Sequence, residues 1–193
     1  KNFLKTELDI RDGFTLLYAG RVSKDKSLDL LCEVYRRLAK TRDDVNLIVA
    51  GNGPYLSEMK EELENYPRVY FTGALSRDKL PGVYNGADVF LFPSVTDTFG
   101  MVILESLSCG LPALVSNHGG PKELVSGGGG AIVPDQKPDT WVKAILKMVE
   151  LAEKDPESYA QLRIKARASV KESSDWDSIL DDLLGKDSVL LEL

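Results

Sequence analysis

Asp97 and Glu105 are two carboxylates separated by seven residues, and the residues between them are mostly apolar with one glycine. The sequence predicts that Asp97 lies in a loop and that Glu105 lies on the helix that follows it. Two carboxylates placed in this way can point into one cleft, with the amides of the first helical turn between them. Acceptor oxygens beside donor amides suit a ligand in which a sugar is joined to a phosphate.

Two cations, Arg21 and Lys26, follow the first apolar run of the chain. Their spacing lets both side chains converge on one anion from a loop, with a short helix beginning just after them. Two such donors can hold a diphosphate without a metal ion. The alternative is a pair of solvated surface charges, which is our interpretation of the neighbouring Lys24. Their place at a strand end favours the binding role for Arg21 and Lys26.

The two carboxylates have different candidate roles and different alternatives. Asp97 can accept hydrogen bonds from sugar hydroxyls, or it can cap the following helix together with Thr98. Glu105 can accept both hydroxyls of a ribose. Glu105 also interrupts the apolar run 101–107, where a helix facing the core would carry an apolar residue, so we predict that it points inward.

Backbone groups are further candidates for ligand contact. Gly100 lets a ligand approach the backbone closely. Gly51 and Gly53 can border a ligand, although a tight turn with Pro54 at the first helical position explains them equally well. The residues at the predicted helix start that would offer backbone amides are Phe99, Gly100, Met101 and Val102.

The histidine and the two cysteines receive no catalytic role. His118 lies in a glycine-rich loop, and no serine or cysteine nucleophile is evidently paired with it. Cys32 and Cys109 each fall within an apolar helical pattern and lack the spacing of a zinc site or a disulfide framework. The cysteines are therefore predicted to be packed thiols in a reduced, cytoplasmic chain, and no metal or other cofactor is predicted.

Composition limits the classes of function. With 193 residues and 43% hydrophobic content, the sequence predicts one domain, residues 1–193, with a core at 14–152 and a helical tail at 153–193. A net charge of −6 argues against binding nucleic acid over a broad surface. No apolar run approaches the roughly 18 residues of a membrane span. The chain begins with Lys1 rather than methionine, which suggests an excised piece of a longer protein.

Short apolar runs alternate with amphipathic stretches along the chain. This alternation predicts an α/β fold with a doubly wound, mostly parallel, Rossmann-like sheet and C-terminal helices after Pro138. In such sheets ligands bind at the carboxyl ends of the strands, where the candidate residues are predicted to lie. The predicted strands are 14–19, 45–50, 69–71, 89–92, 113–115 and 131–133. The predicted helices are 28–40, 55–65, 78–85, 100–108, one from 138, 156 to about 173, and 176–184.

Taken together, several ordered motifs resemble the C-terminal, donor-binding half of retaining GT-B glycosyltransferases of the family 4 type. The resemblance covers about residues 14–149 and is more specific than any single motif. The motifs are Tyr18-Ala19-Gly20-Arg21 with Lys26, Val49-Ala50-Gly51-Asn52-Gly53-Pro54, Val69-Tyr70-Phe71-Thr72-Gly73, and the block from Asp97 to Pro112.

The resemblance implies a nucleotide-diphospho-sugar donor and metal-independent transfer with retention of configuration. It implies that Arg21 and Lys26 bind the diphosphate, that Asp97 contacts the sugar and that Glu105 binds the ribose. Leu75 would lie near the nucleobase. The backbone contacts near the sugar and phosphate would come from Phe99, Gly100, Met101 and Val102, and the catalytic pair would be Asp97 and Glu105.

The sequence also departs from the family. Asp97 stands where the family usually has the first glutamate of its E-x7-E motif, and Ser27 follows Lys26 where glycine is common. We expect the family's N-terminal, acceptor-binding domain to lie outside these 193 residues, so the isolated domain is expected to be inactive as a transferase. The acceptor is unknown, and any peripheral membrane association is expected only through that N-terminal domain. The alternatives left open are a noncatalytic nucleotide-binding or assembly module and a GT-B nucleotide-sugar epimerase.

Overall fold

The structure is a computed structural model that describes residues 2–173, without the side chains of 171–173. Its described part contains a six-stranded sheet in the order β3-β2-β1-β4-β5-β6, with every pairing parallel. The order runs outward in both directions from the centre, as in a doubly wound fold. The strands are β1 (Phe14–Ala19), β2 (Val45–Ala50), β3 (Val69–Gly73), β4 (Val89–Phe92), β5 (Ala113–Ser116) and β6 (Gly130–Val133).

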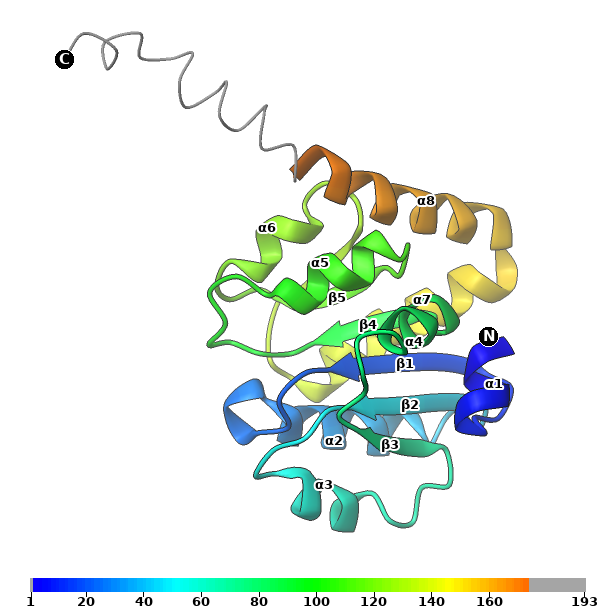
Figure 1. The fold of residues 1–193 in the computed structure, drawn as a ribbon, viewed down its shortest axis with the longest axis vertical. Coiled ribbons are helices and arrows are strands. Elements are labelled where there is room, and N and C mark those ends of the chain that lie inside the picture. The colour runs from blue at the N-terminus through cyan, green and yellow to red at the C-terminus, as the bar shows by residue number, and fades with distance from the viewer. Residues whose placement is uncertain (1, 174–193) are drawn as a thin grey trace, which may run out of the picture.

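Helices connect the strands and cover both faces of the sheet (Figure 1). Parallel neighbours require such crossovers, because each strand must return to the same end of the sheet before the next begins. The helices are α1 (Asn2–Leu8), α2 (Leu28–Leu38), α3 (Leu56–Glu62), α4 (Leu80–Gly86), α5 (Met101–Ser108), α6 (Pro121–Val125), α7 (Pro138–Lys154) and α8 (Pro156–Ser173), with a short 3-10 helix η1 (Lys24–Lys26).

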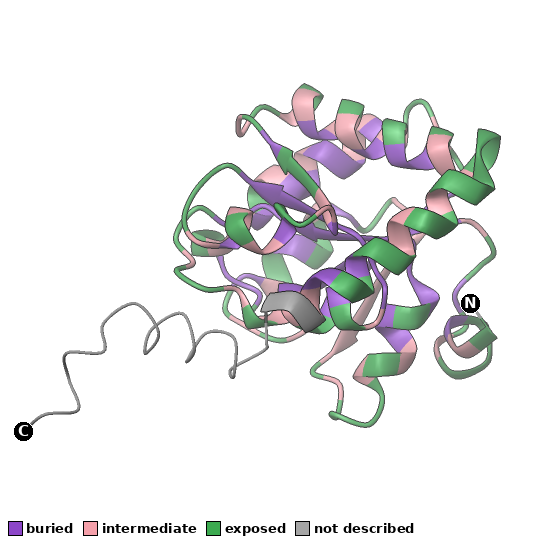
Figure 2. Cartoon of the chain, turned by 90° about the horizontal axis from the view of Figure 1, so that it is seen from above, coloured by how far each residue is buried: buried purple, intermediate pink, exposed green. Residues whose placement is uncertain are grey.

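The sheet separates two apolar clusters, one under each layer of helices. Successive residues of β1 alternate between them, because neighbouring side chains of a strand point to opposite faces. Leu16 and Tyr18 pack with α2 and α7, whereas Leu17 and Ala19 pack with α1, α4, α5, α6 and α8. The central strands are buried along their length, as Figure 2 shows.

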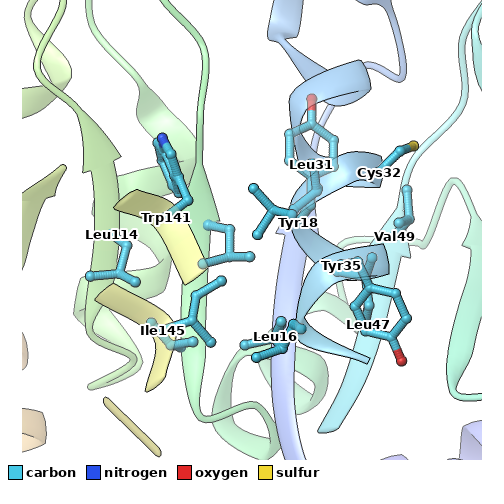
Figure 3. Close-up of a cluster of buried hydrophobic side chains, with 14 of the residues drawn as sticks. Leu16, Tyr18, Leu31, Cys32, Tyr35, Leu47, Val49, Leu114, Trp141 and Ile145 are labelled. Carbon is cyan, nitrogen blue, oxygen red and sulfur yellow. The ribbon is translucent and has the colours of Figure 1, made fainter. Parts of the chain in front are cut away.

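Trp141 is among the largest fully buried side chains and stabilises the first cluster. It stems from α7 and belongs to the same cluster as the labelled β1 and α2 side chains of Figure 3. Its indole N–H donates to the backbone oxygen of Asp135, so the buried ring leaves no polar group unpaired. This packing ties the helices after Pro138 to the sheet.

The predicted fold class and the predicted strands are confirmed, with shifts of one or two residues at some ends. Two helices were not predicted. α1 packs on α4, where Gly82 and Gly86 admit Phe3 and Leu4 closely, and the short α6 begins at Pro121. The predicted helix 176–184 lies outside the described residues. The division into core and tail stays a prediction.

All strands end at the same edge of the sheet, which is the side to which the arrows of Figure 1 point. We call it the carboxyl edge. The chain leaves β1 through residues 20–23 into η1, leaves β2 through Gly51 to Pro54, and leaves β4 through the loop 93–100 into α5. These three connections carry most of the predicted site residues.

Candidate functional site

Two adjoining cavities lie at the carboxyl edge, with volumes of about 420 and 330 Å³. We call them the nucleoside cavity and the phosphate cavity, after the roles argued below. Both are lined by Ala19, Gly20, Arg21 and Val102, so they form one continuous hollow. The nucleoside cavity is also lined by the predicted residues Gly51, Leu75 and Glu105, and the phosphate cavity by Lys26, Asp97, Phe99, Gly100 and Met101.

Gly53 lines neither cavity. A side chain at Gly53 would place its Cβ 2.2 Å from the backbone oxygen of Val22, so this glycine lets two loops pack together. Gly51 has both properties, because it lines the nucleoside cavity and its φ is +149°. A Cβ there would lie 1.8 Å from the backbone oxygen of Gly20. The turn explanation therefore holds for Gly53, and Gly51 combines close packing with a place at the cavity wall.

The loop after β1 presents Arg21 and Lys26 on the wall of the phosphate cavity. Tyr18 holds this loop from below, because its hydroxyl donates to the backbone oxygen of Arg21 at 2.7 Å. Burial, and then the negative charge of Asp97, raise the pKa of Tyr18 well above its ordinary value. The hydroxyl therefore remains a proton donor at any physiological pH, and the loop keeps this tether.

Lys26 and Asp97 form an ion pair inside the phosphate cavity. The Lys26 Nζ lies 2.8 Å from the Asp97 Oδ1, and the two side chains are 20% and 23% exposed. The second carboxylate oxygen, Oδ2, is buried and has no hydrogen-bond partner among the described residues. Buried acceptors are normally satisfied, so this oxygen is an acceptor available to a ligand or to ordered water.

The capping alternative for Asp97 is wrong in this structure. The residue before α5 is Gly100, whose φ is +81°, and no side chain caps the helix. Asp97 is instead fixed through its backbone by the neighbouring loop. A Cβ on Gly119 would lie 2.3 Å from the Asp97 backbone oxygen, so only glycine permits this approach.

The sequence predicted Glu105 on the inward side of its helix, but the residue is exposed. The helical repeat places it on the same face as Met101 and Ser108, while Ile103 and Leu107 face the sheet. The exposed face borders the nucleoside cavity, so the carboxylate still reaches the candidate site. Its Oε2 accepts a hydrogen bond of 2.9 Å from the hydroxyl of Tyr84.

The N-terminus of α5 lies at the phosphate cavity. Phe99 and Met101 are 56% and 60% exposed, and no acidic residue occupies the first turn of the helix. The first amides of a helix have no partner within it and attract negative charge. The amides, Arg21 and Lys26 thus give the phosphate cavity donors from two directions.

His118 and the cysteines take no part in this arrangement. The His118 Nδ1 lies 3.1 Å from the hydroxyl of Ser116, which also accepts a hydrogen bond from Gln136. Cys32 is buried, and burial raises the pKa of its thiol to about 11. Cys109 is partly buried, and burial raises its pKa as well.

Within residues 2–173, no group of three or more His, Cys, Asp or Glu side chains could hold a metal ion. The same part of the chain has no helix long and apolar enough to cross a membrane.

Sequence reasoning missed several residues of the nucleoside cavity. Tyr84 is the most informative of them. It is buried and contacts the candidate carboxylate Glu105, but in the sequence it is only one residue of a predicted amphipathic helix. Ala74 and Leu80 also line this cavity and were not predicted.

The family model described as "Glycosyl transferases group 1" matches residues 1–169, which is most of the chain. The chain belongs to this family.

Curated relatives agree with that membership. The chain is 37% identical over 122 residues to an alpha-monoglucosyldiacylglycerol synthase of Streptococcus pneumoniae, a match of 61% of this chain and 27% of the relative. It is 32% identical over 149 residues to a GDP-mannose-dependent alpha-(1-6)-phosphatidylinositol dimannoside mannosyltransferase of Mycobacterium tuberculosis, a match of 77% of this chain and 39% of the relative. The matched segments therefore span less than half the length of these relatives.

Solved structures share the fold. HepE of Anabaena, determined in complex with UDP and glucose, aligns with a TM-score of 0.78 at 23% identity over 98% of this chain and 52% of HepE. Sucrose-phosphate synthase of Thermosynechococcus elongatus aligns with a TM-score of 0.77 at 23% identity, over 96% of this chain and 48% of that enzyme. At such identity the likeness supports the GT-B Rossmann-like architecture and says nothing by itself of the ligand.

Proposed function

We propose that this chain is the donor-binding half of a retaining glycosyltransferase of the family 4 type. The observation that supports the proposal is the meeting of four predicted side chains, Arg21, Lys26, Asp97 and Glu105, around one continuous hollow. They come from two regions of the chain, the connection after β1 and the segment that runs from the loop 93–100 into α5, so the meeting of these two regions follows from the fold and not from sequence adjacency. The donor is a nucleoside diphosphate sugar.

The two cavities suit the two ends of such a donor. The nucleoside cavity combines the apolar side chains of Leu75 and Leu80 with the Glu105 carboxylate, which fits a base and a ribose. The phosphate cavity combines two cations with the start of α5, which fits a diphosphate. The free oxygen of Asp97 lies in the same cavity and fits a sugar hydroxyl.

In this proposal the leaving diphosphate is stabilised by side chains and amides. Departure of the nucleoside diphosphate builds negative charge on the phosphate oxygens. Arg21, Lys26 and the α5 amides are in place before the reaction, so they stabilise that charge without reorganising. We infer that no metal ion is required, and binding of donor in the presence of a chelator tests this inference.

The direct experiment is calorimetric titration of the folded chain with UDP, GDP and ADP, and with one sugar nucleotide of each base, with EDTA present throughout. We expect at least one nucleoside diphosphate to bind at submillimolar concentration. A folded sample that binds none of them at millimolar concentration would contradict the proposal. Binding that appears only after a divalent cation is added would contradict the metal-free part alone.

Turnover is tested separately, because the relatives are more than twice as long as the segment that they share with this chain. We expect a longer polypeptide that contains this chain to transfer the sugar to an acceptor with the donor's anomeric configuration. The configuration of the product is read from its anomeric proton in an NMR spectrum. An inverted product would leave donor binding in place and overturn the retaining mechanism.

A further inference from the structure

Tyr84 is buried beside the nucleoside cavity, and its hydroxyl touches a residue of the candidate site. The side chain is 2% exposed and stems from α4, whereas Glu105 stems from α5. The Tyr84 hydroxyl donates to the Glu105 Oε2 at 2.9 Å. The tyrosine ring packs against Phe90 with a centroid distance of 5.9 Å, so the donor is itself fixed from the sheet below.

Glu105 needs such a fixed donor because it stands between two cavities. One is the nucleoside cavity, and the other is a cavity of about 480 Å³ that is also lined by Arg77 and Cys109. An exposed glutamate has several rotamers, and the Arg77 guanidinium would attract its carboxylate to the second cavity. Tyr84 lines both cavities, and its hydrogen bond holds the carboxylate at their shared wall and occupies one oxygen. It leaves Oε1 available to a ligand.

We propose that Tyr84 is a positioning residue that holds the Glu105 carboxylate for the two ribose hydroxyls of the donor. This inference rests on the proposed function and adds a residue to it. The physical reason is entropic, because a carboxylate that is already oriented loses less conformational entropy when it accepts hydrogen bonds from a ligand. Burial and the charge of Glu105 raise the pKa of Tyr84 well above its ordinary value, so the hydroxyl stays protonated and able to donate.

The test combines a change in the protein with a change in the ligand. Tyr84→Phe keeps the ring and its packing and removes only the hydroxyl, so we expect the variant to fold. Its affinity is measured by calorimetry for UDP, GDP and ADP and for the dideoxy analogues that lack both ribose hydroxyls. We expect the wild-type chain to prefer the natural nucleotide by about tenfold or more, because hydrogen bonds to a charged group are strong.

In Tyr84→Phe we expect that preference to shrink by about fivefold, with the affinity for the dideoxy analogue unchanged. Tyr35→Phe is the matched control, because Tyr35 is equally buried and its hydroxyl donates to the Val45 backbone oxygen at 2.9 Å, away from both cavities. The control should change neither affinity. If Tyr84 had only a structural role, Tyr84→Phe would lower the affinity for both nucleotides by the same factor. The experiment therefore distinguishes a structural role from a positioning role.

Several outcomes would overturn the inference. Equal losses for the natural and dideoxy nucleotides in Tyr84→Phe would assign Tyr84 to packing. An unchanged preference would remove it from the site. If the wild-type chain binds a nucleoside diphosphate but ignores the ribose hydroxyls, the donor site stands and this inference fails. If the wild-type chain binds no nucleotide, the proposed function and the inference fail together.

Discussion

The two edges of the sheet both carry arginines beside a cavity, but they use the arginines differently. At the amino edge, where the strands begin, Arg11, Arg42 and Arg68 line a cavity of about 440 Å³, and two of the three, Arg42 and Arg68, are paired through their guanidinium groups. Arg42 binds the Asp44 carboxylate at 2.7 Å and also pairs with Glu153 on α7. At the carboxyl edge, Arg21 makes no hydrogen bond or ion pair through its guanidinium with any residue in 2–173.

This difference indicates which edge is arranged for a ligand. The Arg68 guanidinium donates to the backbone oxygen of Asp12 at 2.9 Å and to the Asn46 side chain at 3.0 Å, so it joins the strand starts together. Arg21 and the Asp97 Oδ2 have no such partners in the described structure. Groups that are already paired hold the fold, whereas groups without partners remain open to a ligand. The cavity at the amino edge is therefore the weaker candidate for a ligand site.

The largest effect that we expect comes from Arg21, and it tests the comparison between the two edges directly. Arg21→Ala should weaken nucleoside diphosphate binding by about 1.5 to 3 kcal/mol, because a charge-assisted contact to phosphate is lost. Its thermal stability should change little, since the guanidinium supports no described residue. Calorimetry with the nucleotide that binds best measures the first quantity, and thermal unfolding the second.

Arg11→Ala is the control for Arg21→Ala, because it also removes one exposed arginine side chain, but from the amino edge. It should leave nucleotide binding unchanged. Equal losses in the two variants would mean that only the overall charge of the protein matters. An unchanged affinity in Arg21→Ala would remove Arg21 from the site.

The next expected effect concerns the ion pair between Lys26 and Asp97. In Asp97→Asn the amine of Lys26 is released, so we expect a nucleoside diphosphate without sugar to bind about threefold more tightly. The same variant should lose about tenfold of any preference for the sugar nucleotide over the plain diphosphate, because an anionic acceptor for sugar hydroxyls is gone. Both affinities are measured by titration.

Asp25→Asn is the control for Asp97→Asn. Asp25 also lies near Lys26, at 3.8 Å from its Nζ, but its side chain is 55% exposed and lines neither cavity of the proposed donor site. It should alter the affinity for the plain diphosphate slightly and leave the sugar preference intact. If the two variants behave alike, Asp97 acts only through its charge and does not contact the sugar.

The third prediction concerns the amino edge. Arg42→Ala should lower the thermal midpoint by about 2 °C at neutral pH and leave nucleotide binding unchanged, because exposed ion pairs contribute little. The hydrogen bond from Arg42 lowers the pKa of Asp44, and likewise that of Glu153. A lowered pKa gives stability that is present above the ordinary carboxylate pKa and lost as the pH falls through the lowered value. The gap between wild type and Arg42→Ala should therefore close on acidification.

Thermal unfolding between pH 3 and pH 7 checks this pH dependence at fixed ionic strength. A gap that stays constant down to pH 3 would show that Arg42 stabilises the fold through its aliphatic stem, not through its charge. A loss of nucleotide affinity would show that the two edges are coupled, contrary to the comparison.

The fold was predictable because the strands are apolar runs separated by clear turn residues. The runs at 14–19 and 45–50 are buried along their whole length, so their composition alone marks them as central strands. The helix α6 escaped prediction because its five residues are too few for a helical period to show. α1 was missed because its stability depends on contacts with Gly82 and Gly86, nearly eighty residues along the chain.

The residues that belong to the candidate site could be predicted from the sequence, but the contacts between them could not. The position of Arg21, Lys26 and Asp97 at strand ends follows from the parallel sheet. The side of the helix that carries Glu105 was predicted wrongly, because an apolar neighbourhood in sequence does not say which helical face meets the sheet. The pairing of Glu105 with Tyr84 joins two helices, and no local pattern in a single sequence encodes such a contact.

The smallest expected effect concerns the backbone of the loop that carries Lys26. Ser27 has a φ of +55°, in the left-handed region that favours glycine, and its side chain makes no capping hydrogen bond. Ser27→Gly should raise the free energy of unfolding by about 0.5 kcal/mol, because the relief of strain exceeds the added flexibility of the unfolded chain. Ser126 has a φ of −61° and donates its hydroxyl to the Glu123 backbone oxygen, so Ser126→Gly should lower the stability. Denaturant unfolding measures the free energy of unfolding of both variants. If both substitutions stabilise the protein, or neither does, backbone strain at Ser27 does not explain the effect of Ser27→Gly.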